Sequence, residues 1–258
     1  MKLTINRPIL LLCLLLTACS TLTRPDLGTA TPRPPTVTPF LSPTVVWFPP
    51  TGTPTPSSLT EPATATPDYM PGLGKTLYTD DFTDPDLWSD LGTDYIREGR
   101  LTLAASDGAY LVSLNQELFI SDFYAEVLVH LNLCRNTDEY GILVRAAPVS
   151  YYRFTLTCNG QIQADRIVNR ARTPLKSPYP TMDAPRGSPS GIKIAIWAVG
   201  SEMRFFINDL YQFSVSDPVM PNGSLGFFVR ASEDTPITIS FSDLIIRGVN
   251  ANQTSLVP

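Results

Sequence analysis

An all-β sandwich of two antiparallel sheets is the fold that the sequence predicts for residues 76–248. Beyond Lys75, short segments rich in Val, Ile, Leu, Phe and Tyr alternate with Gly, Asn, Asp and Pro. These breaks recur about every ten residues, which is typical of sandwiches and barrels. No stretch of about 12 residues shows helical periodicity, so we expect almost no helix.

Each apolar segment between two breaks is an expected strand. The twelve expected strands are Leu77–Phe82, Arg100–Ala105, Ala109–Leu114, Phe123–Leu133, Tyr140–Ala147, Tyr151–Cys158, Gln161–Val168, Ile192–Val199, Met203–Ile207, Tyr211–Val215, Ser224–Arg230 and Ile237–Arg247. Together they are enough for one large sandwich.

Alternation within these strands predicts which side chains face the core, because neighbouring side chains point to opposite faces of a sheet. From Phe123 to Leu133 every odd position is apolar, so this face is expected to be buried. In Tyr151–Cys158 the predicted inward set is Tyr152, Phe154, Leu156 and Cys158. The turns fit the pattern, since Asn159-Gly160 and Asn208-Asp209 suit tight hairpins.

The segments YTDDF (78–82), GRLTL (99–103), YGILVR (140–145) and YYRFTLTCNG (151–160) resemble the jelly rolls of the concanavalin A-like lectin/glucanase superfamily. IKIAIWAVG, MRFFINDLY, GSLGFFVR and ITISFSDLIIRG continue the resemblance, which covers residues 76–248 and is nearest to the laminin-G-like and 3-keto-disaccharide hydrolase-like branches. It implies a two-sheet jelly roll. It implies no single activity, because such a fold hosts unrelated functions.

The first 18 residues are predicted to be a lipoprotein signal peptide. Lys2 and Arg7 precede an apolar run, Ile9–Leu16, which is too short to span a bilayer. LTAC, ending at Cys19, resembles the bacterial lipobox, which implies that Cys19 is acylated. The alternative is an ordinary signal peptide in which Cys19 is incidental.

Residues 19–75 are expected to be a disordered tether. Between Ser20 and Pro71 lie 13 of the 25 prolines and 13 threonines, which are half of that stretch. Such a composition cannot bury a core. Residues 249–258 are expected to be a C-terminal tail.

The charge of the chain argues against a nucleic-acid partner. Removing the first 70 residues leaves 15 basic against 21 acidic groups, a net charge of −6. Such a domain should repel phosphate backbones.

A catalytic motif is missing from the sequence. Retaining glucanases of this superfamily carry E-x-D-x-E or E-x-D-x-x-E on one strand, and no segment matches this pattern. Glu126 is the only carboxylate of its strand, and an ion pair with Arg145 or Arg153 is its simplest role. His130 is the only histidine, so neither a serine-hydrolase triad nor a zinc site can be assembled in the usual way.

No cofactor is expected. Calcium stays an open alternative, with Asp107, Asp138, Glu233 and Asp234 as unspecific loop candidates.

Cys134 and Cys158 are predicted to form a disulfide in an extracytoplasmic compartment. Strict alternation, however, turns Cys134 outward and Cys158 inward, whereas a disulfide requires a Cα separation below about 7 Å. Two buried thiols are the alternative.

Five outward polar or aromatic side chains are the candidates for ligand binding, because sugar sites combine aromatic rings with hydrogen-bonding groups. They are Glu126, Arg145, Tyr151, Arg153 and Trp197. Trp197 has a second interpretation as a core residue, since its strand is apolar on both sides.

The leading functional hypothesis is a monomeric, lipid-anchored surface protein on the outer side of a bacterial membrane, displaying a non-catalytic module that binds glycan or another envelope partner. Two rivals are a glycoside hydrolase with an unrecognised site and a structural or assembly domain without a soluble ligand. The sequence does not distinguish inner from outer membrane.

Overall fold

The computed structural model describes residues 67–89, 95–232 and 235–250, all within one compact unit, Ala63–Pro258. The signal peptide, Cys19 and most of the predicted tether lie outside the described residues. The described part consists mainly of β-strands joined by turns and loops, with a three-residue 3-10 helix at Pro85–Leu87. None of its helices is long and apolar enough to cross a membrane.

Fourteen strands are present in the described residues. They are β1 (Leu73–Asp80), β2 (Ile96–Arg97), β3 (Arg100–Ala105), β4 (Tyr110–Leu114), β5 (Phe123–Leu133), β6 (Glu139–Ala147), β7 (Ser150–Thr157), β8 (Gln161–Val168), β9 (Ala171–Pro180), β10 (Ser190–Val199), β11 (Glu202–Ile207), β12 (Leu210–Ser216), β13 (Ser224–Arg230) and β14 (Ile237–Val249).

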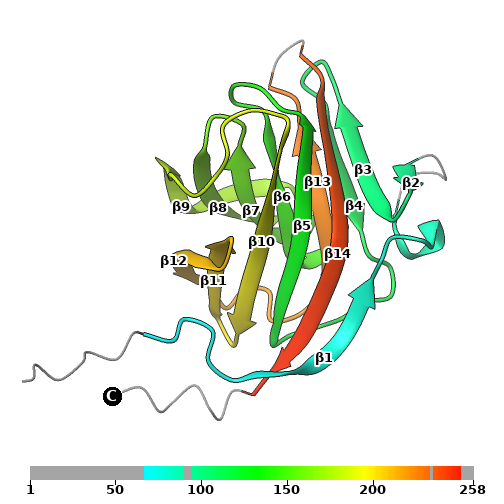
Figure 1. Cartoon of the computed structure of the whole chain (residues 1–258). Helices are drawn as coiled ribbons and strands as arrows, with labels where there is room; N and C mark the ends of the chain where they lie inside the picture. The colour runs from blue at the N-terminus through cyan, green and yellow to red at the C-terminus, as the bar shows by residue number, and fades with distance from the viewer. Residues whose placement is uncertain (1–66, 90–94, 233–234, 251–258) are drawn as a thin grey trace, which may run out of the picture. The chain divides into compact units, whose positions relative to one another are not determined.

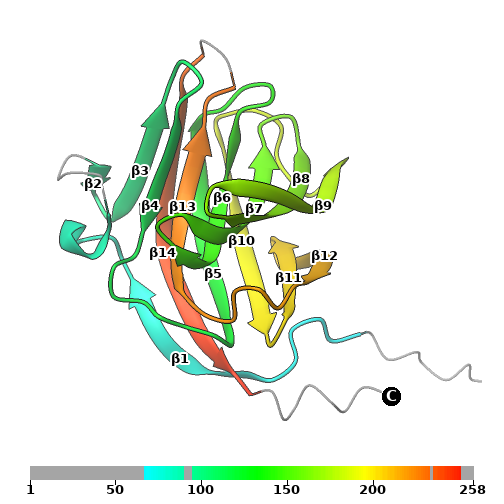
Figure 2. The same cartoon turned by 180° about the vertical axis from the view of Figure 1, so that it is seen from behind.

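The strands form two antiparallel sheets packed face to face (Figure 1). The eight-stranded sheet has the order β12-β11-β10-β5-β14-β3-β2, with β1 added beside β14. The six-stranded sheet has the order β4-β13-β6-β7-β8-β9 and lies in front in the reverse view (Figure 2). The predicted all-β, two-sheet antiparallel sandwich is therefore confirmed.

The core lies between the inner faces of the two sheets. The predicted inward set of β7 and the following residue, Tyr152, Phe154, Leu156 and Cys158, is buried as expected. Aromatic rings from both sheets meet there: Phe227 of β13 lies 4.3 Å from Phe241 of β14, centroid to centroid, in a stacked arrangement. Burial of such large apolar surfaces is the main driving force of folding.

The domain begins earlier than predicted. β1 starts at Leu73 and pairs with the end of β14, with Leu73 opposite Val249, so the two ends of the described domain leave at the same end of the sandwich (Figure 1). The preceding residues also contact the domain, since the Tyr69 ring stacks on Tyr211 with centroids 4.1 Å apart. The predicted tether was thus wrong in including Tyr69–Lys75.

Two strands were missed by the sequence prediction. β2 has only two residues, and β9 carries Pro174, Pro178 and Pro180 in a largely exposed run without alternation. Proline cannot donate to a ladder, but it is tolerated at a sheet edge, where β9 lies. The sequence of β9 therefore lacked the alternation from which the other strands were predicted.

The predicted hairpin turns differ in their geometry. Asn208 and Asp209 both have positive φ, of 50° and 66°, as the two central residues of a type I′ turn require. At Asn159-Gly160 only Gly160 has positive φ, 84°, and its N–H donates to the Thr157 carbonyl at 2.9 Å. This connection is a longer turn with glycine in the left-handed position.

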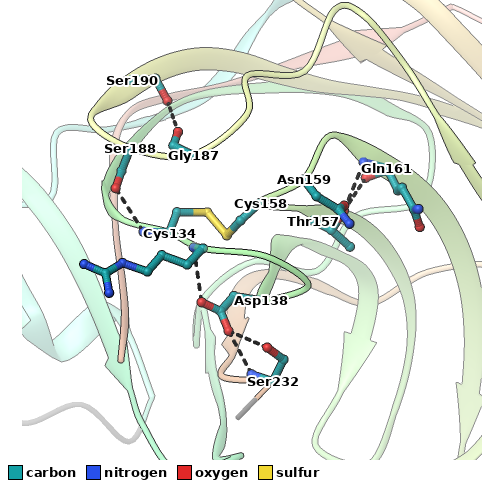
Figure 3. The surroundings of a disulfide bond; sticks show 11 residues. Cys134, Asp138, Thr157, Cys158, Asn159, Gln161, Gly187, Ser188, Ser190 and Ser232 are labelled. Carbon is teal, nitrogen blue, oxygen red and sulfur yellow. Dashed lines mark hydrogen bonds between the residues drawn. A yellow bond between two sulfur atoms is a disulfide. The ribbon is translucent and has the colours of Figure 1, made fainter. Parts of the chain in front are cut away.

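Cys134 and Cys158 form a disulfide at one end of the sandwich (Figure 3), with Cα atoms 5.4 Å apart. Both residues are buried, so the expected outward orientation of Cys134 was wrong. The reason is that β5 ends at Leu133, and alternation stops applying beyond the strand end. Asp138 supports this end by accepting hydrogen bonds from the backbone N–H and the hydroxyl of Ser232, at 2.9 and 2.8 Å.

Candidate functional site

A depression of about 490 Å³ lies on the outer face of the six-stranded sheet, the side turned away from the other sheet. Strands β4, β7, β8, β9 and β13 and two hairpin turns contribute to it. The lining residues are Tyr110, Val112, Pro148, Val149, Tyr151, Arg153, Ile167, Arg170, Arg172 and Arg230. We call this surface the arginine depression.

Arg153 is at the centre of the polar network in the arginine depression. Its Nη2 donates to Oδ2 of Asp165 at 2.7 Å, on the neighbouring strand β8. Its Nη1 lies 3.8 Å from Oε2 of Glu139. Because Arg153 is only 8% exposed and Asp165 is fully buried, this pair is held with little freedom at the floor of the depression.

Two further arginines surround this pair. Arg172 Nε donates to Oδ1 of Asp165 at 2.8 Å, and Arg230 Nη1 lies 3.7 Å from Glu139 Oε2. The Arg172 and Arg230 side chains are each about half exposed. Both carboxylates at the floor are therefore paired with guanidinium groups, and the outer ends of two arginines remain accessible to solvent.

The network also sets the protonation of Arg153. Burial alone would lower the pKa of Arg153, but the hydrogen bond to Asp165 and the negative charges of Asp165 and Glu139 outweigh burial and raise it. Arg153 is thus a permanent positive charge.

Aromatic side chains form one wall of the arginine depression. The hydroxyls of Tyr110 and Tyr151 are 3.2 Å apart, and the Arg153 guanidinium lies 5.5 Å from the centroid of the Phe228 ring. Burial, followed by the contact with Tyr151, raises the pKa of Tyr110 well above its usual range. Tyr110 is therefore neutral at physiological pH and presents a hydroxyl for hydrogen bonding.

The five predicted ligand residues do not form one site. Tyr151 and Arg153 lie together in the arginine depression. Glu126 on β5 and Trp197 on β10 belong to the other sheet. The prediction therefore combined residues from both layers of the sandwich.

Glu126 has different partners from those expected. Its Oε2 accepts from the Tyr124 hydroxyl at 2.8 Å and lies 3.5 Å from Nζ of Lys193. The predicted ion pair with Arg145 or Arg153 is wrong, because neither arginine lies on this sheet.

Trp197 is buried, in agreement with its second interpretation as a packed residue. It lies on the outer face of the eight-stranded sheet, beneath the chain that precedes β1. Its Nε1 donates to the Pro71 carbonyl at 3.0 Å, and the Arg204 guanidinium lies 4.3 Å from its ring centroid. No sugar ring can reach the indole while this segment is in place.

Arg145 is also buried rather than outward, and its side chain points into loops at the end of the sandwich. Nη2 and Nη1 donate to the carbonyls of Ser121 and Met220, at 3.0 and 3.3 Å. Arg145 has a φ of 50° within a register shift of β6, which interrupts the regular alternation. Its role is to tie these two loops together.

The remaining candidates for chemistry do not form a site in the described residues. His130 Nε2 lies 3.0 Å from the Ser242 hydroxyl on the outer face of the eight-stranded sheet, and burial lowers the pKa of His130. Asp138 is buried in loop contacts, Asp107 is exposed, and Glu233 and Asp234 lie outside the described residues. Within the described ranges, no three His, Cys, Asp or Glu side chains gather as a metal site would require.

A glycosidase site would need two carboxyl groups flanking the scissile bond. In the arginine depression the Arg153 guanidinium contacts both Glu139 and Asp165 and so stands between them. A substrate could enter between these carboxylates only by displacing a buried ion pair.

Three arginines of the arginine depression were missed by the sequence prediction. Arg170 and Arg172 lie in the β8–β9 hairpin, and Arg230 ends β13. Asn169 and Arg170 both have positive φ, 49° and 68°, so they form a second type I′ turn. Arg170 and Arg172 are close together in the sequence, but only the pairing of β8 with β9 brings them to the same depression as Arg153.

Comparison with solved structures shows the fold. The chain is similar to a Bacillus subtilis protein described as of unknown function with a galectin-like fold (TM-score 0.52, 14% identity, 69% of this chain and 98% of that one). It is also similar to a β-1,3-1,4-glucanase, or lichenase, derived from a mouse hindgut metagenome (0.51, 11%, 67% and 99%). A third similar structure is the catalytic domain of a Thermotoga petrophila laminarinase (0.50, 8%, 68% and 98%).

No protein-family model and no curated protein matches the sequence. The structural matches extend over two thirds of this chain and nearly all of each neighbour. At these identities they show architecture and not activity. The chain therefore has a two-sheet jelly-roll sandwich fold, similar to that of these galectin-like and glucanase structures.

Proposed function

We propose that this protein is a lipid-anchored extracytoplasmic protein whose jelly-roll domain binds glycan in the arginine depression without cleaving it. The observation that carries the proposal is the depression itself, in which Tyr110 and Tyr151 stand beside fixed guanidinium groups. Aromatic faces beside oriented hydrogen-bond donors are what a sugar ring requires for recognition.

The non-catalytic part of the proposal rests on the pairing of the carboxylates. Asp165 accepts from both Arg153 and Arg172, at 2.7 and 2.8 Å, so it is neither a free nucleophile nor a proton donor. Glu139 lies within 4 Å of two arginines. Both carboxylates are thus held by guanidinium groups instead of facing an open substrate position.

The anchoring part rests on the sequence alone. Cys19 follows a short apolar run and precedes a long Pro/Thr stretch. Acylation of Cys19 would hold the domain at a membrane surface while the stretch gives it reach. Labelling cells with a radioactive fatty acid tests this part: the full chain should carry the label, and the Cys19→Ala variant should not.

A glycan array with the full chain tests the binding part. Tyr151→Ala should weaken binding about tenfold, since it removes an aromatic surface from the depression. Tyr95→Ala, which removes a partly exposed tyrosine outside the depression, is the matched control and should bind normally.

Each bound glycan should also be incubated with the protein and assayed for new reducing ends. Release of reducing sugar would contradict the non-catalytic proposal and favour a hydrolase. If no glycan is retained, the domain is a structural or assembly module instead.

A further inference from the structure

The arginine depression has an unusual charge for this protein. It is lined by four arginines and by no aspartate, glutamate or lysine. The chain beyond residue 70 has 15 basic and 21 acidic groups, so this surface is opposite in sign to the domain that carries it. Even when Asp165 and Glu139 beneath them are counted, two of the four positive charges remain uncompensated.

One donor at the floor of the depression lacks an acceptor. Arg153 donates from Nη2 to Asp165, but its buried Nε has no hydrogen-bond partner. A buried polar atom without a partner costs free energy unless a bound group or water completes it.

The two half-exposed arginines can supply the remaining contacts. Arg172 uses Nε for Asp165, and Arg230 is paired only loosely with Glu139, at 3.7 Å. The planar fork of a guanidinium matches the two oxygens of a carboxylate. A carboxylate at the mouth of the depression would therefore be attracted by groups that the fold already positions.

Aromatic and apolar side chains of the depression supply a surface for the body of a sugar ring. Tyr151, Pro148 and Val149 present aromatic and apolar surface to the same depression. A simple anion would not contact the aromatic and apolar side chains, and a neutral sugar would not neutralise the positive charge of the arginines.

We propose that the arginine depression recognises a carboxylated sugar, a uronic acid residue of an acidic polysaccharide. Its ring packs against Tyr151, and its carboxylate contacts Arg230, Arg172 and Arg170. This inference rests on the proposed glycan-binding function and specifies the ligand class for the same site. A sulfated sugar would present similar oxyanion chemistry, and the test separates the two.

The test measures affinity of the full chain for four probes: polygalacturonate oligosaccharides, the same oligosaccharides after reduction of their carboxyl groups to alcohols, dextran sulfate, and dextran. We expect the tightest binding to the carboxylated probe and at least about tenfold weaker binding to its reduced counterpart. The affinity should fall as salt is raised, because the contact is between charges.

The variants locate the contact. The double variant Arg170→Gln/Arg230→Gln removes two charges whose side chains are exposed or half exposed, and it leaves the Arg153–Asp165 pair intact. It should weaken binding to polygalacturonate about tenfold or more. Arg100→Gln removes one exposed arginine from β3 in the other sheet and should change the affinity less than about twofold. Circular dichroism confirms that each variant is folded.

The outcomes distinguish this inference from the proposed function. Equal binding to the carboxylated and reduced probes, unaffected by the double variant, overturns the inference and leaves glycan binding standing. Tighter binding to dextran sulfate than to polygalacturonate overturns the assignment of a carboxylate. No retention of any glycan, including those of the array, overturns both proposals.

Discussion

The indole N–H of Trp197 donates to the carbonyl oxygen of Pro71 at 3.0 Å, and so joins the chain before β1 to the outer face of the eight-stranded sheet. Two contacts reinforce this junction. Arg204 Nη1 donates to the Tyr69 carbonyl at 2.9 Å, and Tyr69 stacks on Tyr211. The last residues before β1 are therefore part of the folded domain.

Trp197→Phe should lower the stability of the domain without affecting ligand binding. The substitution keeps an aromatic ring under Arg204 but removes the donor to Pro71, so we expect a loss of about 1 kcal/mol in the free energy of unfolding. Urea denaturation measures this loss, and hydrogen exchange should be faster at the backbone amides of Met70 and Gly72. Reduced glycan affinity at unchanged stability would instead place Trp197 in a binding site.

Asp165 should be essential for the stability of the arginine depression. Asp165→Ala leaves the buried Arg153 without its 2.7 Å partner, and removing one member of a buried ion pair costs about 3–5 kcal/mol. Guanidinium chloride denaturation should show this loss. Asp107→Asn, at an exposed aspartate, is the control and should stay within about 0.5 kcal/mol of the wild type. If Asp165→Ala lowers the free energy of unfolding by less than about 1 kcal/mol, water must replace Asp165 as the partner of Arg153.

Asp217 should make stability depend on pH. Burial alone would raise the pKa of Asp217, but hydrogen bonds from Tyr152, the Val219 backbone N–H and Arg166, at 2.7, 3.0 and 2.6 Å, outweigh burial and lower it. An unfolded aspartate titrates near pH 3.9. The stabilisation by Asp217 is thus fully present above about pH 4 and is lost as pH falls through the lower pKa of the folded state.

The variant Asp217→Asn tests this dependence. The wild type should exceed the variant in free energy of unfolding by about 1–2 kcal/mol at pH 6, and the difference should shrink below pH 4. Urea denaturation at several pH values measures it. A difference that stays constant down to pH 2 would show that the charge of Asp217 contributes nothing. Asp209→Asn, at a half-exposed carboxylate, should show a much smaller difference at every pH.

Alternation predicted the fold well because it is a local property. It correctly assigned the inward faces of β5 and β7, and it placed Tyr151 and Arg153 on an outward face. It cannot say to which sheet a strand belongs, because that depends on pairing between distant segments. Glu126 and Trp197 were therefore grouped with Tyr151 although they lie in the other layer.

The remaining errors have local causes that break the period of two. Arg145 follows a register shift and turns into the protein, and Cys134 lies just beyond the end of β5. The exposed arginines of the site belong to the proline-containing hairpin arm of β9 and to the end of β13. Neither segment has an alternating sequence pattern, so the sequence did not predict that these arginines lie close together.

The disulfide between Cys134 and Cys158 should contribute substantially to the free energy of unfolding of the domain. Cys134 and Cys158 are 24 residues apart, and closing a loop of this length stabilises the folded state by about 3–4 kcal/mol. The double variant Cys134→Ala/Cys158→Ala should therefore unfold at a clearly lower urea concentration than the wild type. Wild type treated with a reductant should unfold at about the same concentration as the variant, apart from a smaller loss from the two truncated side chains. Digestion of unreduced, alkylated protein should release the Cys134 and Cys158 peptides joined to each other. Separate peptides, each carrying the alkyl group, would show that the two cysteines are free thiols in the native protein.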